Sequence, residues 1–176
     1  MKLYVTRHGR TQWNEENRIC GITDIPLAEK GIEQAQSLAR ETEGKGIDRI
    51  ICSPLMRAVQ TAQIVSQVCG APVAADRRLI EQNYGIYEGM QHSEPDFMAN
   101  KRQFALPYPE GESQLQLAAR VFALLEEIKR VHEHETVLLV SHGAVCRMIH
   151  AYFTPMTADE FIGFVMPNCR LLEYEF

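Results

Sequence analysis

The sequence lacks the features that mark membrane, secreted and zinc-binding proteins. No apolar run approaches the roughly 18 residues of a membrane span, and the apolar start at residues 1–5 is too short for a signal peptide. The five cysteines are odd in number, widely scattered and without a Cys-x-x-Cys pair, which argues against a disulfide framework or a zinc site. We therefore expect a cytoplasmic protein with no membrane association.

Positive charge is scarce as well. The chain has 18 Lys and Arg against 23 Asp and Glu, a net charge of −5, so its overall field repels nucleic acid and anionic membranes. It also has no Asp-x-Asp cluster that would hold Mg²⁺. An anionic substrate must therefore be held by a local cationic pocket, and we expect neither a metal nor another cofactor.

The 176 residues, 45% of them apolar, suit one compact domain over residues 1–176. Short apolar stretches at residues 3–6, 49–52, 136–140 and 170–174 predict strands. Helical spacing occurs at residues 28–43 and from Ser113, and Ser53-Pro54 predicts the N-cap and first turn of a helix that Gly70 ends. Another helix is expected from Gly143. Strands that alternate with helices predict a doubly wound α/β domain.

Two histidines, His8 and His142, directly follow predicted buried strands. In open α/β sheets, binding sites form outside the carboxyl ends of the strands, so both side chains should face the same edge. Arg7 lies beside His8, Arg57 lies in the first turn of a predicted helix, where backbone N–H groups favour an anion, and Asn14 is a neutral donor on the first loop. Together these residues would make a ring of donors suited to one phosphate.

Glu81, preceded by two large apolar residues, is the candidate proton donor. A partly desolvated carboxyl group there would favour its protonated form and could pass a proton to a leaving oxygen. Each feature also has a structural explanation, because a histidine after a buried strand is often a hydrogen-bonded core residue, and a lone arginine is usually solvated. From the residues alone, the phosphate site and the structural explanation both stay open.

The sequence resembles the histidine phosphatase superfamily, which contains the cofactor-dependent phosphoglycerate mutases and related small phosphatases. The resemblance covers nearly the whole chain in six ordered segments. These are residues 7–14 (RHGRTQWN), 21–27 (GITDIPL), 53–58 (SPLMRA), 79–81 (LIE) with Tyr84-Gly85 and Glu88-Gly89 after it, 111–113 (GES) and 140–143 (VSHG). The fold implied is a three-layer α/β/α sandwich with a mixed, mostly parallel sheet.

The resemblance also implies roles for individual residues. His8 would be the nucleophile that becomes phosphohistidine, which requires its other ring nitrogen to donate to a fixed acceptor. Glu81 would be the proton donor and acceptor. The phosphoryl group would be bound by Arg7, Asn14, Cys20, Gly21, Arg57, Glu81, Tyr84, His142 and Gly143. Phosphoryl transfer needs mainly positioning and compensation of charge, which agrees with this donor set.

Departures from the family pattern bear on the substrate. Arg10 stands where Glu or Gln is common, and is either a solvated charge or a ligand for a second anionic group. The segment at residues 90–112, expected as an irregular surface excursion that caps the pocket, is shorter than the mutase insertion that carries paired arginines. Arg102 stands alone there, and His92 takes the place of a mutase lysine. Arg10, His92 and Arg102 are thus the candidates for a second anion.

These features favour a phosphatase over a mutase, because a mutase needs a closing lid and a second phosphate site that keep water from its intermediate. The segment Tyr87-Glu88-Gly89 also resembles the phosphatase branch. The mutase remains the main alternative, followed by a non-catalytic phosphate-binding member and by a metal site built from His8, Glu81 and His142. The expected partner is a small phosphorylated metabolite, such as a sugar phosphate, α-ribazole phosphate or a phosphoglycerate. Oligomeric state is not readable from the sequence.

Overall fold

A computed structural model describes residues 1–176. Its centre is a five-stranded sheet in the order β3-β2-β4-β1-β5, with β1 to β4 parallel and β5 antiparallel to β1. The strands are β1 (Lys2–Arg7), β2 (Arg49–Cys52), β3 (Val73–Ala75), β4 (Thr136–Ser141) and β5 (Leu171–Glu175). The helices are α1 (Gln12–Glu15), α2 (Glu29–Thr42), α3 (Met56–Cys69), α4 (Pro95–Asn100), α5 (Gln114–Val131), α6 (Gly143–Phe153) and α7 (Ala158–Gly163).

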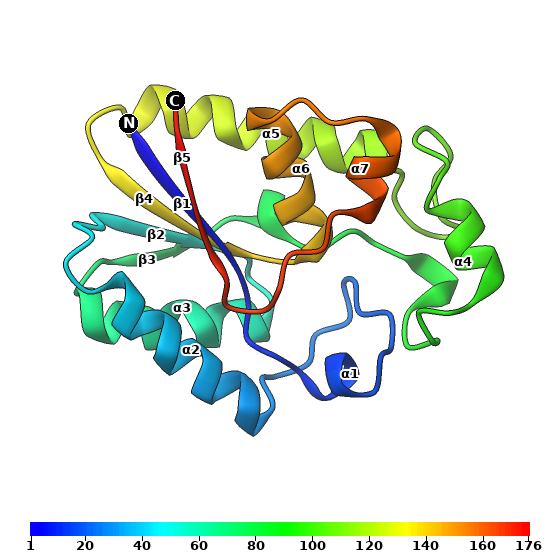
Figure 1. The fold of residues 1–176 in the computed structure, drawn as a ribbon, viewed down its shortest axis with the longest axis horizontal. Helices are drawn as coiled ribbons and strands as arrows, with labels where there is room; N and C mark the ends of the chain where they lie inside the picture. The colour runs from blue at the N-terminus through cyan, green and yellow to red at the C-terminus, as the bar shows by residue number, and fades with distance from the viewer.

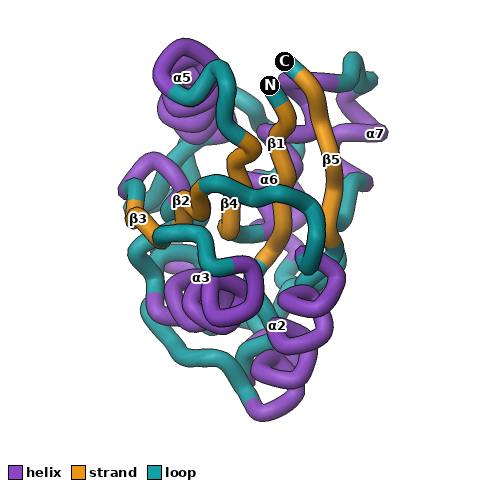
Figure 2. Tube along the Cα trace, turned by 90° about the vertical axis from the view of Figure 1, so that its left-hand side faces the viewer, coloured by secondary structure: helices purple, strands orange, loops and turns teal.

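Helices cover both faces of the sheet, with α2 and α3 on one side and α5 and α6 on the other (Figures 1 and 2). The alternation of side chains along each strand produces the two cores. In β1, Leu3 and Val5 pack into the core under α5 and α6, and Tyr4 packs into the core over α2 and α3. The predicted three-layer α/β/α sandwich with a mixed, mostly parallel sheet is therefore confirmed.

The expected strands are present, and the expected helices agree to within a few residues. The start of α3 differs, because its N-cap is Leu55 and not Ser53. The backbone N–H of Ser53 donates to the Val140 carbonyl at 3.0 Å, which extends the sheet contact of the preceding strand by one residue. Since Leu55 has no capping side chain, the carboxylate of Asp24 accepts from the Met56 N–H at 2.7 Å instead. Local sequence alone does not reveal a cap from another loop.

The segment at residues 90–112 is more ordered than an irregular excursion, because it contains the short helix α4. Phe97 of α4 is buried and stacks on Tyr108, with ring centroids 5.4 Å apart, and it meets the edge of Tyr84 at the same separation. These aromatic contacts, together with Ile19 and Tyr87, form a third small core. The segment at residues 90–112, called the cap below, is thus fixed to the rest of the protein by its own hydrophobic contacts.

The carboxyl ends of β1 and β4 lie side by side, because these two strands pair in register from Lys2 with Thr136 to Arg7 with Ser141. The next residue in each strand is a histidine, so His8 and His142 leave the sheet at neighbouring points, as expected. Helices α1 and α4 lie beyond this end of the sheet (Figure 1). The chain ends lie at the opposite end.

Candidate active site

His8 is held in one tautomer by two hydrogen bonds. Its Nδ1 is 2.6 Å from the carbonyl oxygen of Gly9, which can only accept, so Nδ1 carries the proton. The Nε of Arg57, which can only donate, lies 3.2 Å from Nε2, so Nε2 presents its lone pair. Burial lowers the pKa of His8 well below its ordinary value, and the charges of Arg57 and Arg7 lower it further. His8 is therefore a neutral imidazole whose Nε2 lone pair accepts from Arg57.

Arg57 lies at the start of α3 and is completely buried. Its Nη2 donates to the Gly21 carbonyl at 2.6 Å, and its Nη1 donates to the Thr23 carbonyl at 2.8 Å. The loop that carries these carbonyls is fastened in turn by the carboxylate of Glu88, which accepts from the N–H groups of Ile22 at 2.7 Å and Thr23 at 2.8 Å. The direction of the guanidinium group is thus set by a loop that Glu88 organises.

His142 is the N-cap residue of α6 and is also completely buried. Its ring centroid lies 5.1 Å from that of His8, and neither of its ring nitrogens has a hydrogen-bond partner. Burial lowers its pKa well below the ordinary value, and the charges of Arg57, His8 and Arg7 act in the same direction. Unpartnered buried polar atoms are rare. Here they leave a neutral donor free beside the His8 ring.

A carboxylate and a second arginine complete this centre. Glu81 is 5% exposed, and its two oxygens accept from the N–H of Gln82 at 2.9 Å and the N–H of Ala144 at 3.1 Å. Arg7 donates through Nη1 to the Met166 carbonyl at 3.0 Å, while its buried Nε has no partner. The centre therefore joins a nucleophilic nitrogen, a carboxyl group and several free N–H donors, which is the set that phosphoryl transfer needs.

A cavity of about 610 Å³ opens beside this centre. Its wall includes eight of the residues predicted from the sequence, namely Arg7, Arg10, Asn14, Cys20, Glu81, Tyr84, His92 and Gly143. His8, Arg57 and His142 do not line the cavity; all three are buried, and His8 and His142 adjoin the lining residues Arg7 and Gly143 in the sequence. The cavity therefore gives a ligand access to the residues that enclose the His8 nitrogen.

Comparison with known proteins shows the family of the chain. The profile of the histidine phosphatase superfamily (branch 1) matches residues 3–176. The chain belongs to the histidine phosphatase superfamily. It is 37% identical over 185 residues to the probable phosphoglycerate mutase GpmB of Proteus mirabilis, a match that covers 100% of this chain and 85% of that protein. The protein is thus a phosphatase or a mutase of the histidine phosphatase superfamily.

Solved structures of the superfamily share the fold closely. Bacillus stearothermophilus YhfR superposes with a TM-score of 0.89 at 33% identity, covering 99% of this chain and 90% of that one. A mycobacterial glucosyl-3-phosphoglycerate phosphatase, in complex with VO3, gives a TM-score of 0.88 at 27% identity, covering 98% and 90%. The α-ribazole phosphatase of Shigella flexneri gives 0.86 at 28% identity, covering 98% and 89%.

Two of the predicted ligands of this histidine phosphatase superfamily member need correction. Arg102 is exposed and forms an ion pair with Asp159 at 3.2 Å, away from the cavity, so it is removed from the candidates for a second anion. Gly21 does not line the cavity but supports Arg57 through its carbonyl. An added Cβ at Gly21 would overlap the Gln82 carbonyl oxygen, which explains why glycine is needed there.

Two cationic residues of the cavity wall, Lys101 and Arg147, were not among the predicted ligands. Lys101 follows α4 directly, so its position depends on a helix that the sequence did not predict. Arg147 lies within α6, where a single arginine in a helix is normally a surface residue. The available signal was spacing, because Arg147 lies four residues after Gly143 and therefore on the same helix face.

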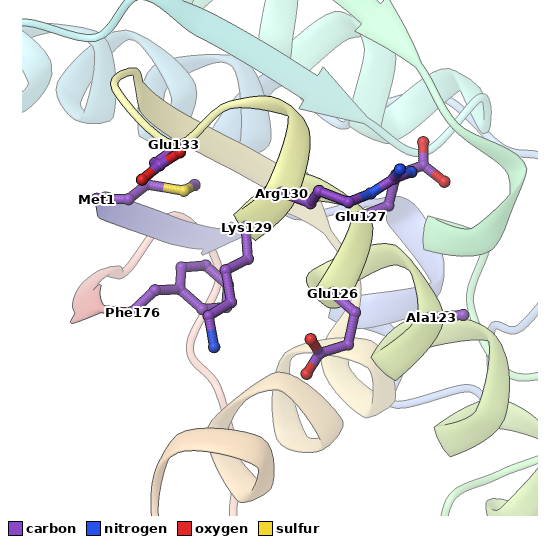
Figure 3. Close-up of a pocket in the computed structure, with 8 residues that line it drawn as sticks. All are labelled: Met1, Ala123, Glu126, Glu127, Lys129, Arg130, Glu133 and Phe176. Atoms are coloured by element: carbon purple, nitrogen blue, oxygen red, sulfur yellow. The ribbon is translucent and has the colours of Figure 1, made fainter.

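The remaining functional alternatives are a shared metal site, a membrane-spanning helix and a ligand site in a separate hollow. No group of three or more His, Cys, Asp and Glu side chains is placed to share a metal ion, so His8, Glu81 and His142 do not form such a group. No helix has both the length and the apolar composition that crossing a bilayer requires. Figure 3 shows a separate hollow of about 750 Å³ between α5 and the chain ends, lined by Met1, Ala123, Glu126, Glu127, Lys129, Arg130, Glu133 and Phe176. None of the predicted site residues lies there.

Proposed function

We propose that this superfamily member is a phosphomonoesterase that hydrolyses a small organic phosphate through a phosphohistidine on Nε2 of His8. The observation that carries the proposal is the state of this imidazole. The Gly9 carbonyl holds the proton on Nδ1, and burial among cations keeps the ring neutral, so Nε2 is ready to attack. A histidine with only a packing role would not need its lone pair directed toward a ring of donors.

In the first step, Nε2 of His8 forms a bond to phosphorus while the bond from phosphorus to the leaving oxygen breaks. In the structure, Arg57 donates to this nitrogen. Its Nε must therefore turn from His8 to the phosphoryl group when substrate binds. Arg7 and His142, whose buried Nε and ring nitrogens lack partners, would donate to the phosphoryl oxygens. Asn14 uses its Oδ1 to accept from the Thr11 N–H, which leaves its amide nitrogen to donate.

Glu81 would act in both steps. As the carboxylic acid it gives its proton to the leaving oxygen, and as the carboxylate it takes a proton from the attacking water. The new oxygen–phosphorus bond forms as the nitrogen–phosphorus bond breaks, which returns the lone pair to His8 and releases inorganic phosphate. Glu81 is positioned for this exchange, because two backbone N–H groups fix its carboxyl group beside Gly143.

The alternative is transfer of the phosphoryl group between positions of a phosphoglycerate, and the mutase names of the curated relatives favour it. Hydrolysis is supported by the names of two solved neighbours and by the short cap, of which the six-residue α4 is the only helix. A mutase must keep water from its phosphohistidine, and this cap offers little additional chain to close over the site.

One experiment separates these functions. The purified protein is given 3-phosphoglycerate with 2,3-bisphosphoglycerate, and phosphate release and 2-phosphoglycerate are both followed. Fast isomerisation with negligible phosphate release would overturn the hydrolase proposal. A parallel screen of phosphorylated metabolites, ranked by kcat/KM, identifies the substrate. His8→Ala should abolish turnover while the fold persists, and EDTA should leave the rate unchanged.

A further inference from the structure

The cavity beside His8 has more positive charge than one phosphate group uses. Four cationic residues line it, Arg7, Arg10, Lys101 and Arg147, against the single carboxylate of Glu81. The chain as a whole carries a net charge of −5, so this concentration of cations is local. Arg7 belongs to the proposed phosphoryl centre, together with the buried Arg57. Lys101 and Arg147 have no assigned partner.

Arg147 is a buried cation without an anion. It is 6% exposed, its buried Nε has no hydrogen-bond partner, and it takes part in no ion pair of the chain. Its guanidinium group lies 4.9 Å from the ring centroid of Phe161, a contact that positions the group and leaves its N–H donors unused. A desolvated charge without a partner is costly, so the donors that face the cavity are placed for an incoming anion.

Arg147 lies about one helical turn from the end of α6 that borders the proposed phosphoryl centre. Gly143, Ala144 and Arg147 line the cavity from one face of α6. A Cβ built on Gly143 would lie 3.7 Å from both Cζ of Arg7 and Oε2 of Glu81, so this end of the helix borders the proposed phosphoryl centre. Arg147 is four residues further along, a displacement of about 6 Å along the helix axis. A substrate of a few carbon atoms can span that interval.

Lys101 approaches the same region from the cap. It is half-buried, and its pKa is lowered by burial and, next, by the charge of Arg147, so the two cations share one environment. Its neighbour Arg102 is exposed and paired with Asp159. Of two adjacent cations after α4, one therefore faces the cavity without a carboxylate and the other is neutralised on the surface.

We propose that Arg147 and Lys101 bind a second anionic group of the substrate, a carboxylate or a second phosphate, while the first phosphate lies at His8. The preferred substrates are then phosphate monoesters with a second anion a few bonds away. This inference rests on the proposed phosphatase function. Arg10, also on the cavity wall, donates through Nη2 to the Asn14 carbonyl at 3.2 Å, and its buried Nε has no partner.

The test compares substrates that differ only in the second group. Glycerol 3-phosphate has a hydroxymethyl group where 3-phosphoglycerate has a carboxylate. The monophosphate of 1,4-butanediol, its bisphosphate and 4-phosphooxybutanoate extend the spacing and separate the carboxylate from the phosphate. We expect kcat/KM to be at least tenfold higher for a member with a second anionic group than for the matching phosphate monoester with an uncharged group in that place. Arg147→Gln and Lys101→Gln should each lower that ratio by up to about tenfold, toward a value of one.

Arg102→Gln is the matched control, because it removes an adjacent cation that does not line the cavity, and it should leave the ratio unchanged. A ratio near one for the unmodified protein at every spacing overturns the second site while leaving hydrolysis intact. Equal losses on substrates with and without the second anionic group, in both variants, overturn it as well. If Arg147→Gln does not fold, the half-buried Lys101→Gln decides alone. Absence of any phosphate release that depends on His8 instead overturns the phosphatase function itself.

Discussion

Two fully buried neutral imidazoles predict a specific loss of stability in mild acid. The pKa values of His8 and His142 are lowered well below the ordinary value, chiefly by burial and then by neighbouring arginines. In the unfolded chain both side chains regain an ordinary pKa of about 6.5. Below that pH the unfolded chain binds more protons than the native protein does. The free energy of unfolding must therefore fall as the pH falls through this range.

The magnitude follows from the proton balance. At pH 5.5 an unfolded histidine is protonated about ten to one, which stabilises the unfolded state by about 1.4 kcal/mol relative to a histidine that stays neutral in the native state. His8 and His142 together should lower the free energy of unfolding by about 3 kcal/mol between pH 7.5 and pH 5.5. This is a large part of the 5–15 kcal/mol that is typical of folded domains.

Urea unfolding followed by circular dichroism at pH 7.5, 6.5 and 5.5 measures this loss, in buffers without phosphate or sulfate, which would bind the site. His142→Asn should remove about half of the pH dependence, because one titrating group is lost. The control is His134→Asn, which changes an exposed histidine and should leave the dependence intact. Equal stability at pH 7.5 and pH 5.5 would refute the reasoning, since it would mean that the native imidazoles bind protons as readily as the unfolded ones.

Three further variants test the support of the site and the core. Glu88→Gln weakens the charge-assisted bonds that hold the loop beneath Arg57, so kcat/KM should fall about tenfold to a hundredfold with the fold retained. Gly21→Ala forces a Cβ into the Gln82 carbonyl and should lower activity and cost about 1–3 kcal/mol of stability. Leu125→Ala, at a completely buried position of α5, should cost about 2–5 kcal/mol in urea unfolding without changing KM.

Controls for these variants are available on the surface. Glu110→Gln changes an exposed carboxylate outside the loop contacts and should leave activity unchanged. Full activity in Glu88→Gln would contradict the role given to the loop in directing Arg57. A Leu125→Ala protein with unaltered stability would contradict the packing assigned to α5.

Much of the fold was predictable because its signals are local. The buried strands are continuous apolar runs, and α5 begins at a capping box in which Ser113 and Gln116 satisfy each other's backbone N–H groups. The elements missed were short. β3 has three residues, α1 has four, and α4 and α7 have six each, too few for a periodic pattern to develop. The start of α3 was misplaced because Asp24, which caps it, is distant in the sequence.

The residues of the site also fall into two groups, those that the sequence predicts and those that only the packing of the chain shows. His8 and His142 were predicted as neighbours from sheet topology, because residues that follow adjacent parallel strands must meet at one edge. The function of the Gly21 carbonyl depends on how separate segments pack, and no local pattern encodes it. For Arg147 the local signal is its four-residue spacing from Gly143. Arg102 was a plausible anion ligand by residue type, and only the fold shows that its partner is Asp159.

The arrangement in which Arg57 covers Nε2 of His8 affects how chemical modification would report on this protein. His8 is 3% exposed and His142 is inaccessible, whereas His134 is open to solvent. A reagent that acylates imidazoles should therefore consume surface histidines first, with activity intact. The early part of an inactivation time course would then suggest, wrongly, that no histidine is essential. The nitrogen proposed to react with substrate is thus much better shielded from other electrophiles than the surface imidazoles are.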